Sequence, residues 1–488
     1  MSKGSGVLII YTGGTIGSVP SKKSNPSSAL VPTKSFIPLL DLVPGYDAKT
    51  RTMVLENKEI SVHVKDWNEP MDSANLRIEH WYEMAKMIRD HYDEYEGFVI
   101  LHGTDTLTYS SSALSFILQN LSKPVIFTGS QRPLVRTRSD AIQNLVTSIE
   151  IAASKSLRGQ TISEVCVFFR DSLMRGNRTT KTSANDYRAF NSPNYAILGK
   201  ASKRFQLDFK QLSGQVKGKL ELLPGLEHKV FSLDLFPGMS MDLFENLLSS
   251  PGLRGVVLKT YGAGNAPTLP RFLNALRKAS DSGVVILDVT QCWSGEVEMG
   301  LYETSSKLLE CGVVSGMDMT PEAGLTKLMA VLGSEPDAER ARALLQVNLC
   351  GEMAGSTFHY HYPAGRLTQQ IGKIELDAQE HPSIGKISLR NNRLDRAILR
   401  FFGCRNYSEE SIFMKISLVD EKLKKLKMIG KMTIDQGHEN ETIHSVSVPV
   451  MSLQFLKNII KPKLVVESDT SGRDLSWDFV DLSLMTLS

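Results

Sequence analysis

Four short apolar runs, separated by longer segments of helical period, constrain the fold of the first part of this chain. The runs span residues 7–11, 97–103, 123–130 and 164–170, and glycine lies within or shortly after the first three. Uninterrupted apolar runs are typical of strands that are buried on both faces of a sheet, and strands that alternate with helices favour parallel pairing. The sequence therefore predicts an α/β domain with a parallel sheet that helices cover on both faces.

The segments between and after these runs predict the helices and the domain organisation. Residues 75–95, 108–121 and 139–154 predict helices, the last with a Ser-Asp capping signal at its start. The alternation resumes after residue 253, and short period-two segments dominate from about residue 355. Because 488 residues exceed one ordinary domain, several parts are expected. They are an N-terminal α/β domain, a linker, a smaller α/β lobe and a β-rich accessory domain, at residues 1–200, 201–226, 227–355 and 356–488.

Composition limits the partners and the location that we expect. The chain has 56 basic and 53 acidic residues, so it lacks the charge excess of a protein that binds nucleic acid or an anionic membrane. No run approaches the roughly 18 apolar residues of a membrane span, and the apolar run near the start is too short for a secretory signal. The 5 cysteines are scattered and unlike a metal clip, so we expect reduced thiols and a cytoplasmic location.

The first apolar run leads into a glycine-rich turn, Thr12-Gly13-Gly14-Thr15. Such a turn brings backbone N–H groups close to a ligand. A phosphate-binding P-loop would need a Gly-Lys-Ser/Thr sequence, and the dinucleotide fingerprint would need G-x-G; neither is present here. Taken alone, the turn is better explained as a structural connection than as a catalytic one.

A second turn of the same design changes that interpretation. Thr104 and Asp105 also follow an apolar strand and a glycine. They could simply cap the next helix. However, two turns that each present a threonine at the carboxyl end of a strand favour a shared crevice, where open α/β sheets bind their ligands.

Six motifs then identify a family. They are TGGTIG, PMDS, HGTDTL, TGSQRP, GNRTTK and TYGAGNAP, in this order between residues 12 and 267. Together they resemble the bacterial-type L-asparaginases, most of all the cytoplasmic type I branch, over about residues 5–354. The resemblance implies a two-lobe architecture, with a larger N-terminal parallel-sheet domain and a smaller C-terminal α/β lobe. This chain would add a β-rich accessory domain of unknown role.

The resemblance also implies which residues act. Thr15 would be the primary nucleophile, and Thr104, Asp105 and Lys181 would form a proton relay. The Ser73 hydroxyl would hold the α-carboxylate of the substrate and Asp105 its α-ammonium. The substrate-binding residues implied in this way are Gly14, Asp72, Ser73, Thr104 and Asp105.

These residue types suit the hydrolysis of an amide. A threonine hydroxyl attacks poorly until a base removes its proton. Lys181, desolvated beside Thr104 and Asp105, could be the base for Thr104, and backbone N–H groups could stabilise the oxyanion. The expected course is attack on the side-chain amide of L-asparagine, loss of ammonia, an acyl ester on Thr15 and hydrolysis to L-aspartate. Which threonine attacks in which step stays open, and the resemblance implies no metal and no organic cofactor.

The second lobe is expected to complete the active site across the interface of a homodimer or homotetramer. Some family members carry a tyrosine on the segment after the glycine turn, but residues 19–32 contain none. In type I relatives a tyrosine of the second lobe does this work, which indicates Tyr302, although a tyrosine packed in the lobe core explains it equally well. Type I enzymes can also bind asparagine at an allosteric site, where Lys259 would replace the usual arginine. The matching residues are Ser130, Thr180, Lys259 and Cys292.

Three other functions share parts of this pattern. An ammonia-generating subunit of a tRNA-dependent amidotransferase would carry a β domain before the asparaginase portion and a basic surface for tRNA. A non-catalytic amino-acid sensor would not need the nucleophile and the relay together. Lysophospholipase activity occurs in some eukaryotic type I relatives with an ankyrin tail, but we find neither that repeat nor a Gly-x-Ser-x-Gly elbow.

Overall fold

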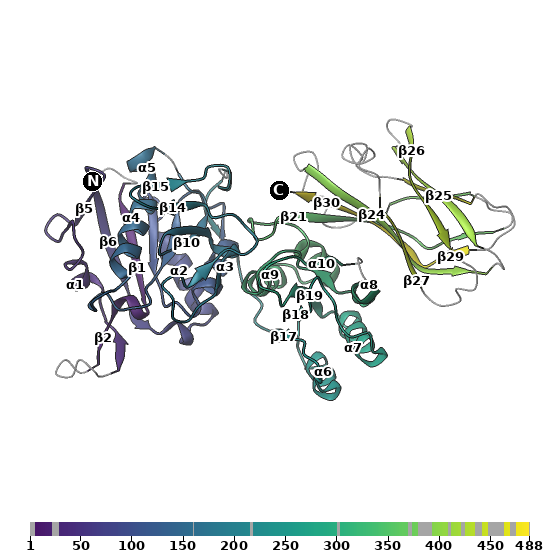
Figure 1. Ribbon diagram of the computed structural model, residues 1–488, viewed down its shortest axis with the longest axis horizontal. Helices are drawn as coiled ribbons and strands as arrows, with labels where there is room; N and C mark the ends of the chain where they lie inside the picture. The colour runs from purple at the N-terminus through teal and green to yellow at the C-terminus, as the bar shows by residue number, and fades with distance from the viewer. Residues whose placement is uncertain are drawn as a thin grey trace.

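The computed structural model consists of an N-terminal α/β domain, a smaller α/β lobe and a β-rich accessory domain, which follow one another along its longest axis (Figure 1). This arrangement confirms the predicted fold class. No helix among the described residues is long and apolar enough to cross a membrane. The structure describes residues 5–21, 29–159, 161–214, 218–299, 303–368, 373–378, 393–407, 411–420, 425–434, 442–447, 463–468 and 475–487.

The N-terminal domain is built on a ten-stranded sheet with the order β15-β14-β11-β10-β9-β7-β1-β6-β5-β4. Its central strands pair in parallel. They are β10 Val165–Phe169, β9 Val125–Thr128, β7 Gly97–Leu101, β1 Val7–Gly13 and β6 Lys58–Met71. All four apolar runs of the sequence form strands of this set, as predicted. Because β1 and β7 are parallel neighbours, their carboxyl ends lie side by side.

The outer strands are antiparallel, which differs from the purely parallel sheet that we predicted. They are β11 Ser172–Arg175, β14 Gly199–Ala201 and β15 Phe205–Leu207 at one edge, and β5 Thr52–Leu55 and β4 Tyr46–Asp47 at the other. Only Arg170 and Asp171 connect β10 to β11, and a two-residue turn can join only antiparallel strands. β15 lies within residues 201–226, the segment that we expected to be a linker.

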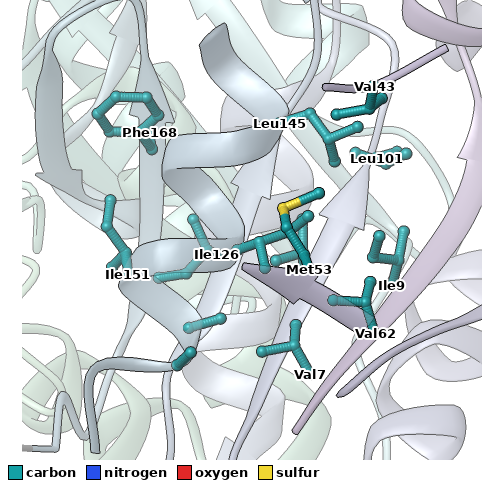
Figure 2. Packing of buried hydrophobic residues seen from close by; sticks show 14 of the residues in the cluster. Val7, Ile9, Val43, Met53, Val62, Leu101, Ile126, Leu145, Ile151 and Phe168 are labelled. Carbon is teal, nitrogen blue, oxygen red and sulfur yellow. The ribbon is translucent and has the colours of Figure 1, made fainter. Parts of the chain in front are cut away.

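Both faces of the sheet are buried, as the continuous apolar strands predicted. Side chains alternate between the faces, so that Val7 belongs to one core cluster and Leu8 to another. The helix α4 (Ala141–Ala152) covers the first face, and Figure 2 shows its side chains packed with those of the central strands. The helices α2 (Ile78–Asp90) and α3 (Leu107–Ile117) cover the second face.

Shorter elements complete this domain, and the hairpin β12–β13 among them carries Lys181. Two further pairs of short strands are β2–β3 and β8–β16. The bounds of these elements are η1 Thr15–Gly17, β2 Ser18–Pro20, β3 Leu30–Pro32, α1 Ile37–Leu40, η2 Ser73–Asn75, β8 Leu118–Gln119, α5 Ser154–Arg158, η3 Gly176–Arg178, β12 Thr180–Lys181, β13 Phe190–Asn191 and β16 Glu221–Leu222.

The second lobe is a four-stranded parallel sheet with helices on both faces. One face packs against α6, α7 and α8, and the other packs against α9 and α10. Its strands are β17 Val230–Asp234, β18 Gly255–Thr260, β19 Val285–Thr290 and β20 Val314–Ser315. Its helices are α6 Met241–Leu248, α7 Pro270–Asp281, α8 Glu303–Glu310, α9 Pro321–Ser334 and α10 Ala338–Leu345.

Buried polar contacts fix the second lobe against the first. The hydroxyls of Ser112 on α3 and Thr326 on α9 lie 2.7 Å apart. The guanidinium of Arg178 pairs with the Asp318 carboxylate at 2.8 Å, and both side chains are nearly inaccessible to solvent. Removing one partner of such a pair leaves a buried charge without compensation, so these contacts specify one arrangement of the lobes.

The accessory domain is a sandwich of two antiparallel sheets. One sheet has the order β21-β30-β24-β29-β22, with β27 also paired to β24, and the other has the order β23-β28-β25-β26. Leu399 of β24 and Ile416 of β25 lie in one core cluster, so the sheets pack face to face. The strands are β21 Gly355–Tyr362, β22 Gly365–Leu367, β23 Lys373–Leu376, β24 Arg393–Asn406, β25 Ile412–Asp420, β26 Lys425–Ile434, β27 Thr442–Ser447, β28 Lys463–Ser468, β29 Leu475–Trp477 and β30 Phe479–Leu487.

Candidate active site

The turns that follow β1 and β7 are in direct contact. Gly13 and Gly14 have φ angles of 120° and 78°, which glycine adopts without strain. A Cβ atom at Gly14 would lie 2.4 Å from the backbone nitrogen of Gly103, so no larger residue fits there. The turn that carries Thr15 therefore packs against the turn that carries Thr104.

Thr15 begins the short helix η1 and is partly exposed, whereas Tyr11 is buried next to the same turn. The Tyr11 hydroxyl donates to the carbonyl oxygen of Gly17 at 3.4 Å. Burial raises the pKa of Tyr11 well above its usual value, and the charge of Asp66 raises it further. Tyr11 is therefore a neutral support for the turn and is unsuited to exchange protons with Thr15.

Lys181 lies between the two other members of the predicted relay. Its Nζ donates to Oγ1 of Thr104 at 3.0 Å and to Oδ1 of Asp105 at 2.6 Å. Thr104 is buried and Lys181 is mostly buried, whereas 65% of the Asp105 side chain is exposed. The hairpin β12–β13 brings Lys181 to this position from a separate part of the sequence. The structure thus joins three of the predicted residues in one chain of hydrogen bonds.

Ser73 presents an unused hydroxyl to the same region. The residue is 3% exposed, and its Oγ makes no hydrogen bond to any described atom. A Cβ atom at Gly103 would lie 2.5 Å from this Oγ, so the hydroxyl borders the turn before Thr104. The Thr106 hydroxyl donates to the Ser73 carbonyl oxygen at 2.8 Å and holds the residue in place. A buried hydroxyl without a partner is costly, which favours a ligand that hydrogen-bonds to it.

Two of the predicted substrate-binding residues are otherwise engaged. Asp72 is exposed, and its Oδ1 accepts a hydrogen bond from the Ala74 backbone at 2.9 Å, which caps η2. The backbone N–H of Gly14 donates to the Met71 carbonyl oxygen at 3.0 Å. Asp72 and Gly14 therefore shape the site in this arrangement, and a ligand would have to displace these bonds to contact the same atoms.

His102 lies beneath the site, and sequence reasoning missed it. Its Nδ1 lies 2.6 Å from the Gly103 carbonyl oxygen and its Nε2 lies 2.9 Å from the Ser110 hydroxyl. Trp81 donates its indole N–H to the same Ser110 oxygen at 2.9 Å. The Ser110 proton is then free for Nε2, and Nδ1–H donates to Gly103. Burial lowers the pKa of His102 to about 4, against a smaller opposing effect of the Gly103 bond, so the ring is neutral near pH 7.

This network fixes the peptide group directly before Thr104. The sequence offered one signal, a histidine between a buried strand and the Gly-Thr-Asp turn. The network could not be inferred, because Ser110, which bonds to His102, and Trp81, which bonds to Ser110, come from two different helices.

Comparison with known proteins agrees with this geometry. Residues 6–212 match the family model described as "Asparaginase, N-terminal", and residues 229–345 match "Glutaminase/Asparaginase C-terminal domain". The two matches together span more than half of the chain. This chain belongs to the asparaginase family.

Individual relatives point to the same family. L-asparaginase 1 of Escherichia coli K12 is 40% identical over 348 residues, which cover 71% of this chain and 97% of that protein. The human 60 kDa lysophospholipase is 36% identical, over 73% of this chain and 63% of that protein. The crystal structure of L-asparaginase I from Vibrio cholerae superposes with a TM-score of 0.63 at 37% identity and covers 72% of this chain and 99% of that one.

Thr180, a predicted effector residue of this asparaginase, links the two lobes. Its hydroxyl donates to Oε1 of Glu322 at 2.7 Å, and the Thr108 hydroxyl donates to the same oxygen at 3.2 Å. Glu322 is buried in the first turn of α9. The residue next to Lys181 is therefore attached to the second lobe.

The other three predicted effector residues are engaged separately. The Ser130 hydroxyl donates to the Arg132 carbonyl oxygen at 2.6 Å. Lys259 pairs with Asp234 at 2.5 Å, and the exposed Cys292 donates its backbone N–H to the hydroxyl of Thr290. In the part of the chain that the structure describes, no hydrogen bond or ion pair joins these four residues to one another. They remain a predicted site.

Tyr302, the predicted partner of the nucleophile from the second lobe, lies outside the described residues. Among the residues that are described, no three cysteine, histidine, aspartate or glutamate side chains come together as a metal site. The accessory sandwich begins after the ranges of both family models.

Proposed function

We propose that this member of the asparaginase family is an L-asparaginase, which hydrolyses L-asparagine to L-aspartate and ammonia. The observation that carries the proposal is the position of Lys181, hydrogen-bonded to both Thr104 and Asp105, whose turn packs against the turn that carries Thr15. This arrangement supplies a hydroxyl nucleophile and a proton relay within one crevice. The named activity of the relatives from E. coli and V. cholerae supports the same reaction.

The charged ends of the substrate orient its amide toward Thr15. In the proposed complex, the unpaired Ser73 hydroxyl donates to the α-carboxylate. Asp105 uses Oδ1 for Lys181 and is largely exposed, so its other carboxylate oxygen accepts from the α-ammonium. Fixing both ends of a short substrate converts the attack into an effectively intramolecular step.

The chemistry then proceeds in two half-reactions. The Thr15 hydroxyl attacks the side-chain amide carbon, ammonia leaves, and an acyl ester remains on Thr15. In each half-reaction Thr104 takes the proton of the attacking hydroxyl or water and passes its own proton to Lys181, which acts as the neutral amine. Lys181 returns the proton through Thr104 to the departing ammonia in the first half-reaction and to the oxygen of Thr15 in the second. Water hydrolyses the ester to release L-aspartate and restore Thr15. Every step uses side chains of this chain, and the proposal includes no metal or organic cofactor.

The proposal extends to a homodimer or homotetramer, to a cytoplasmic location and to allosteric activation by asparagine at the predicted effector residues. Large apolar side chains are exposed after the carboxyl ends of three second-lobe strands, which supports a self-association surface there. They are Phe236 after β17, Leu269 after β18 and Trp293 after β19. The five cysteines all lie among the described residues and none is joined to another by a disulfide, which agrees with a reducing compartment.

The test is ammonia release from L-asparagine and L-glutamine over a wide concentration range. We expect turnover of asparagine by the wild type, loss of at least about 10³-fold in Thr15→Ala, and partial turnover in Thr15→Ser, which keeps a hydroxyl nucleophile. A sigmoidal asparagine curve would support the effector site. Glutamine is one methylene longer, and one methylene changes binding by only about 1–3 kcal/mol, so some glutamine turnover is compatible with the proposal.

The same assay separates the alternatives. If neither free amide releases ammonia, the free amino acid is not the substrate, and an amidotransferase subunit or an amino-acid sensor becomes the better explanation. The name of the human relative makes a lysophospholipid a necessary additional substrate in the panel. Fatty-acid release that survives in Thr15→Ala would indicate a second site.

A second prediction concerns the network beneath the turn. His102→Phe preserves most of the ring volume but removes the hydrogen bonds to Gly103 and Ser110. We expect the free energy of unfolding to fall by about 1–3 kcal/mol. We also expect kcat for asparagine to fall about tenfold or more, because a displaced Thr104 misaligns the relay. Trp81→Phe, which removes a more distant bond of the network, is the control and should lose less kcat. Wild-type kcat in His102→Phe would contradict the positioning role.

A further inference from the structure

The accessory sandwich contacts the second lobe through a buried arginine. Arg400 lies in β24 and is 4% exposed. Its Nη1 donates to the Ser483 hydroxyl at 2.8 Å and lies 3.7 Å from the Asp481 carboxylate, both in β30 of the same sheet. Its Nη2 donates to the Met299 carbonyl oxygen of the second lobe at 3.2 Å. The sandwich joins that lobe through β21, which begins beside the end of β30 (Figure 1).

Burying a guanidinium at a boundary between domains has a large desolvation cost. Burial lowers the pKa of Arg400 from its ordinary value, while the nearby Asp481 charge opposes this shift. A well-packed apolar residue of similar volume is often neutral or stabilising at such a position. The arginine does what an apolar residue cannot, because it extends a hydrogen-bond donor from the sandwich to one backbone carbonyl of another domain.

The Met299 carbonyl group lies at the end of a short segment, Gly295–Met299, which is also hydrogen-bonded to other parts of the molecule. Val297 donates its backbone N–H to the Met317 carbonyl oxygen at 2.9 Å, and Glu298 donates to Ala263 at 3.0 Å. The segment therefore packs between two loops of the second lobe. Its position depends on three domains, because the N-terminal domain holds its first residue.

The contact with the N-terminal domain is made by Asn194. Its side-chain amide donates to the Gly295 carbonyl oxygen at 3.0 Å, and its Oδ1 accepts from the Gly295 N–H at 2.9 Å. The same amide nitrogen donates to the Asp318 carbonyl oxygen at 2.9 Å. Asn194 comes three residues after β13, the strand in which Phe190 pairs with Lys181 of β12.

We propose that Arg400 is a positioning residue, through which the accessory sandwich and the Gly295–Met299 segment set the position of the hairpin that carries Lys181. The inference rests on the proposed function for its consequence in catalysis, since Lys181 is the proposed base. It gives the additional domain a role in the reaction without placing any of its residues in the active site. Contiguous contacts carry the effect from Met299 to Gly295, Asn194 and the hairpin.

The first experiment compares three arginine variants of the full chain. Arg400→Met is expected to lower kcat for asparagine about 5–20-fold with little change in KM, because the relay acts in the transition state whereas Ser73 and Asp105 bind the substrate. Arg400→Lys keeps one donor and should recover part of kcat. Arg405→Met is the matched control, because Arg405 lies on the same strand but pairs with the exposed Asp478. Its kcat should equal that of the wild type.

Hydrogen exchange gives a readout that does not depend on activity. Backbone amides of residues 180–194 should exchange faster in Arg400→Met than in the wild type. Their exchange rates in Arg405→Met should equal those of the wild type. Unchanged exchange in Arg400→Met, or a lower melting temperature with wild-type kcat, would overturn the inference. If the wild type releases no ammonia from asparagine, the proposed function fails, and the exchange result still decides whether Arg400 positions the hairpin.

A double-mutant cycle tests the route. Asn194→Ala should lower kcat in the same direction as Arg400→Met, because it cuts the same series of contacts. If the route is correct, the double variant should lose little more than the worse single variant. Fold-losses that multiply in the double variant would show that Arg400 and Asn194 act independently, which would reject the proposed route.

Discussion

Replacing Lys181 by methionine is expected to lower kcat for asparagine by about 10²–10⁴-fold, the usual contribution of a positioned acid–base group. Methionine retains much of the aliphatic stem but cannot donate to Thr104 or Asp105. Substrate binding should change less than kcat, because Ser73 is untouched and Asp105 gains freedom to face the α-ammonium. Steady-state kinetics at saturating asparagine measure the loss directly.

Lys123→Met is the matched control for this result. Lys123 is also a partly buried lysine that holds two oxygen atoms, the backbone carbonyls of Tyr92 and Tyr95. It precedes β9 and thus lies at the end of the sheet opposite the carboxyl ends that form the site. This variant should lose stability while kcat remains close to wild type. Comparable losses of kcat in both variants would mean that Lys181 acts through general stability and not through the relay.

The sequence was sufficient to predict the central strands and the two threonine turns. A strand such as β7 is buried at every residue, so its apolar run carries enough information by itself. Gly14 was informative for a related reason, since its contact with Gly103 leaves no room for a side chain. A local sequence pattern predicts structure reliably where full burial or a close backbone contact at one position excludes most residue types.

Contacts between distant segments were not accessible to the same reasoning. The bond from Lys181 to Thr104 spans 77 residues, and only the family resemblance suggested it. His102 was overlooked because its burial and its hydrogen-bond network depend on Ser110 and Trp81, which come from separate helices. The antiparallel edge was missed because the two-residue turn at Arg170 carries no glycine. Each of these features is decided by packing between elements and not by the period of one element.

The second lobe contains a carboxyl group that should control stability as a function of pH. Asp288 is fully buried in β19, and its Oδ1 accepts a hydrogen bond from the Thr260 hydroxyl at 2.7 Å. Its Oδ2 has no hydrogen-bond partner among the described atoms and borders the turn at Gly264. Burial raises the pKa of Asp288 to about 8, against a smaller opposing effect of the Thr260 bond.

The sign of the effect follows from the two protonation states. The folded protein keeps the Asp288 proton up to about pH 8, whereas the unfolded chain releases it near the ordinary value of 3.8. Unfolding therefore releases a proton between these limits, and the free energy of unfolding falls as pH rises through this window. Below the window the contribution to stability is fully present. The total loss by pH 8 is on the order of 5 kcal/mol, since one pKa unit corresponds to about 1.4 kcal/mol.

Asp288→Asn removes this dependence while it keeps an acceptor for Thr260. Urea unfolding at pH values from 5 to 9 measures the free energy of unfolding of the second lobe. The stability of the variant relative to that of the wild type should increase with each pH unit up to about pH 8. The difference should then stay constant. Asp281→Asn, at the exposed end of α7, is the control and should follow the wild-type profile. Parallel profiles for Asp288→Asn and the wild type would mean that the carboxyl ionises at its ordinary pH. The turn at Gly264 would then have to accommodate a buried negative charge.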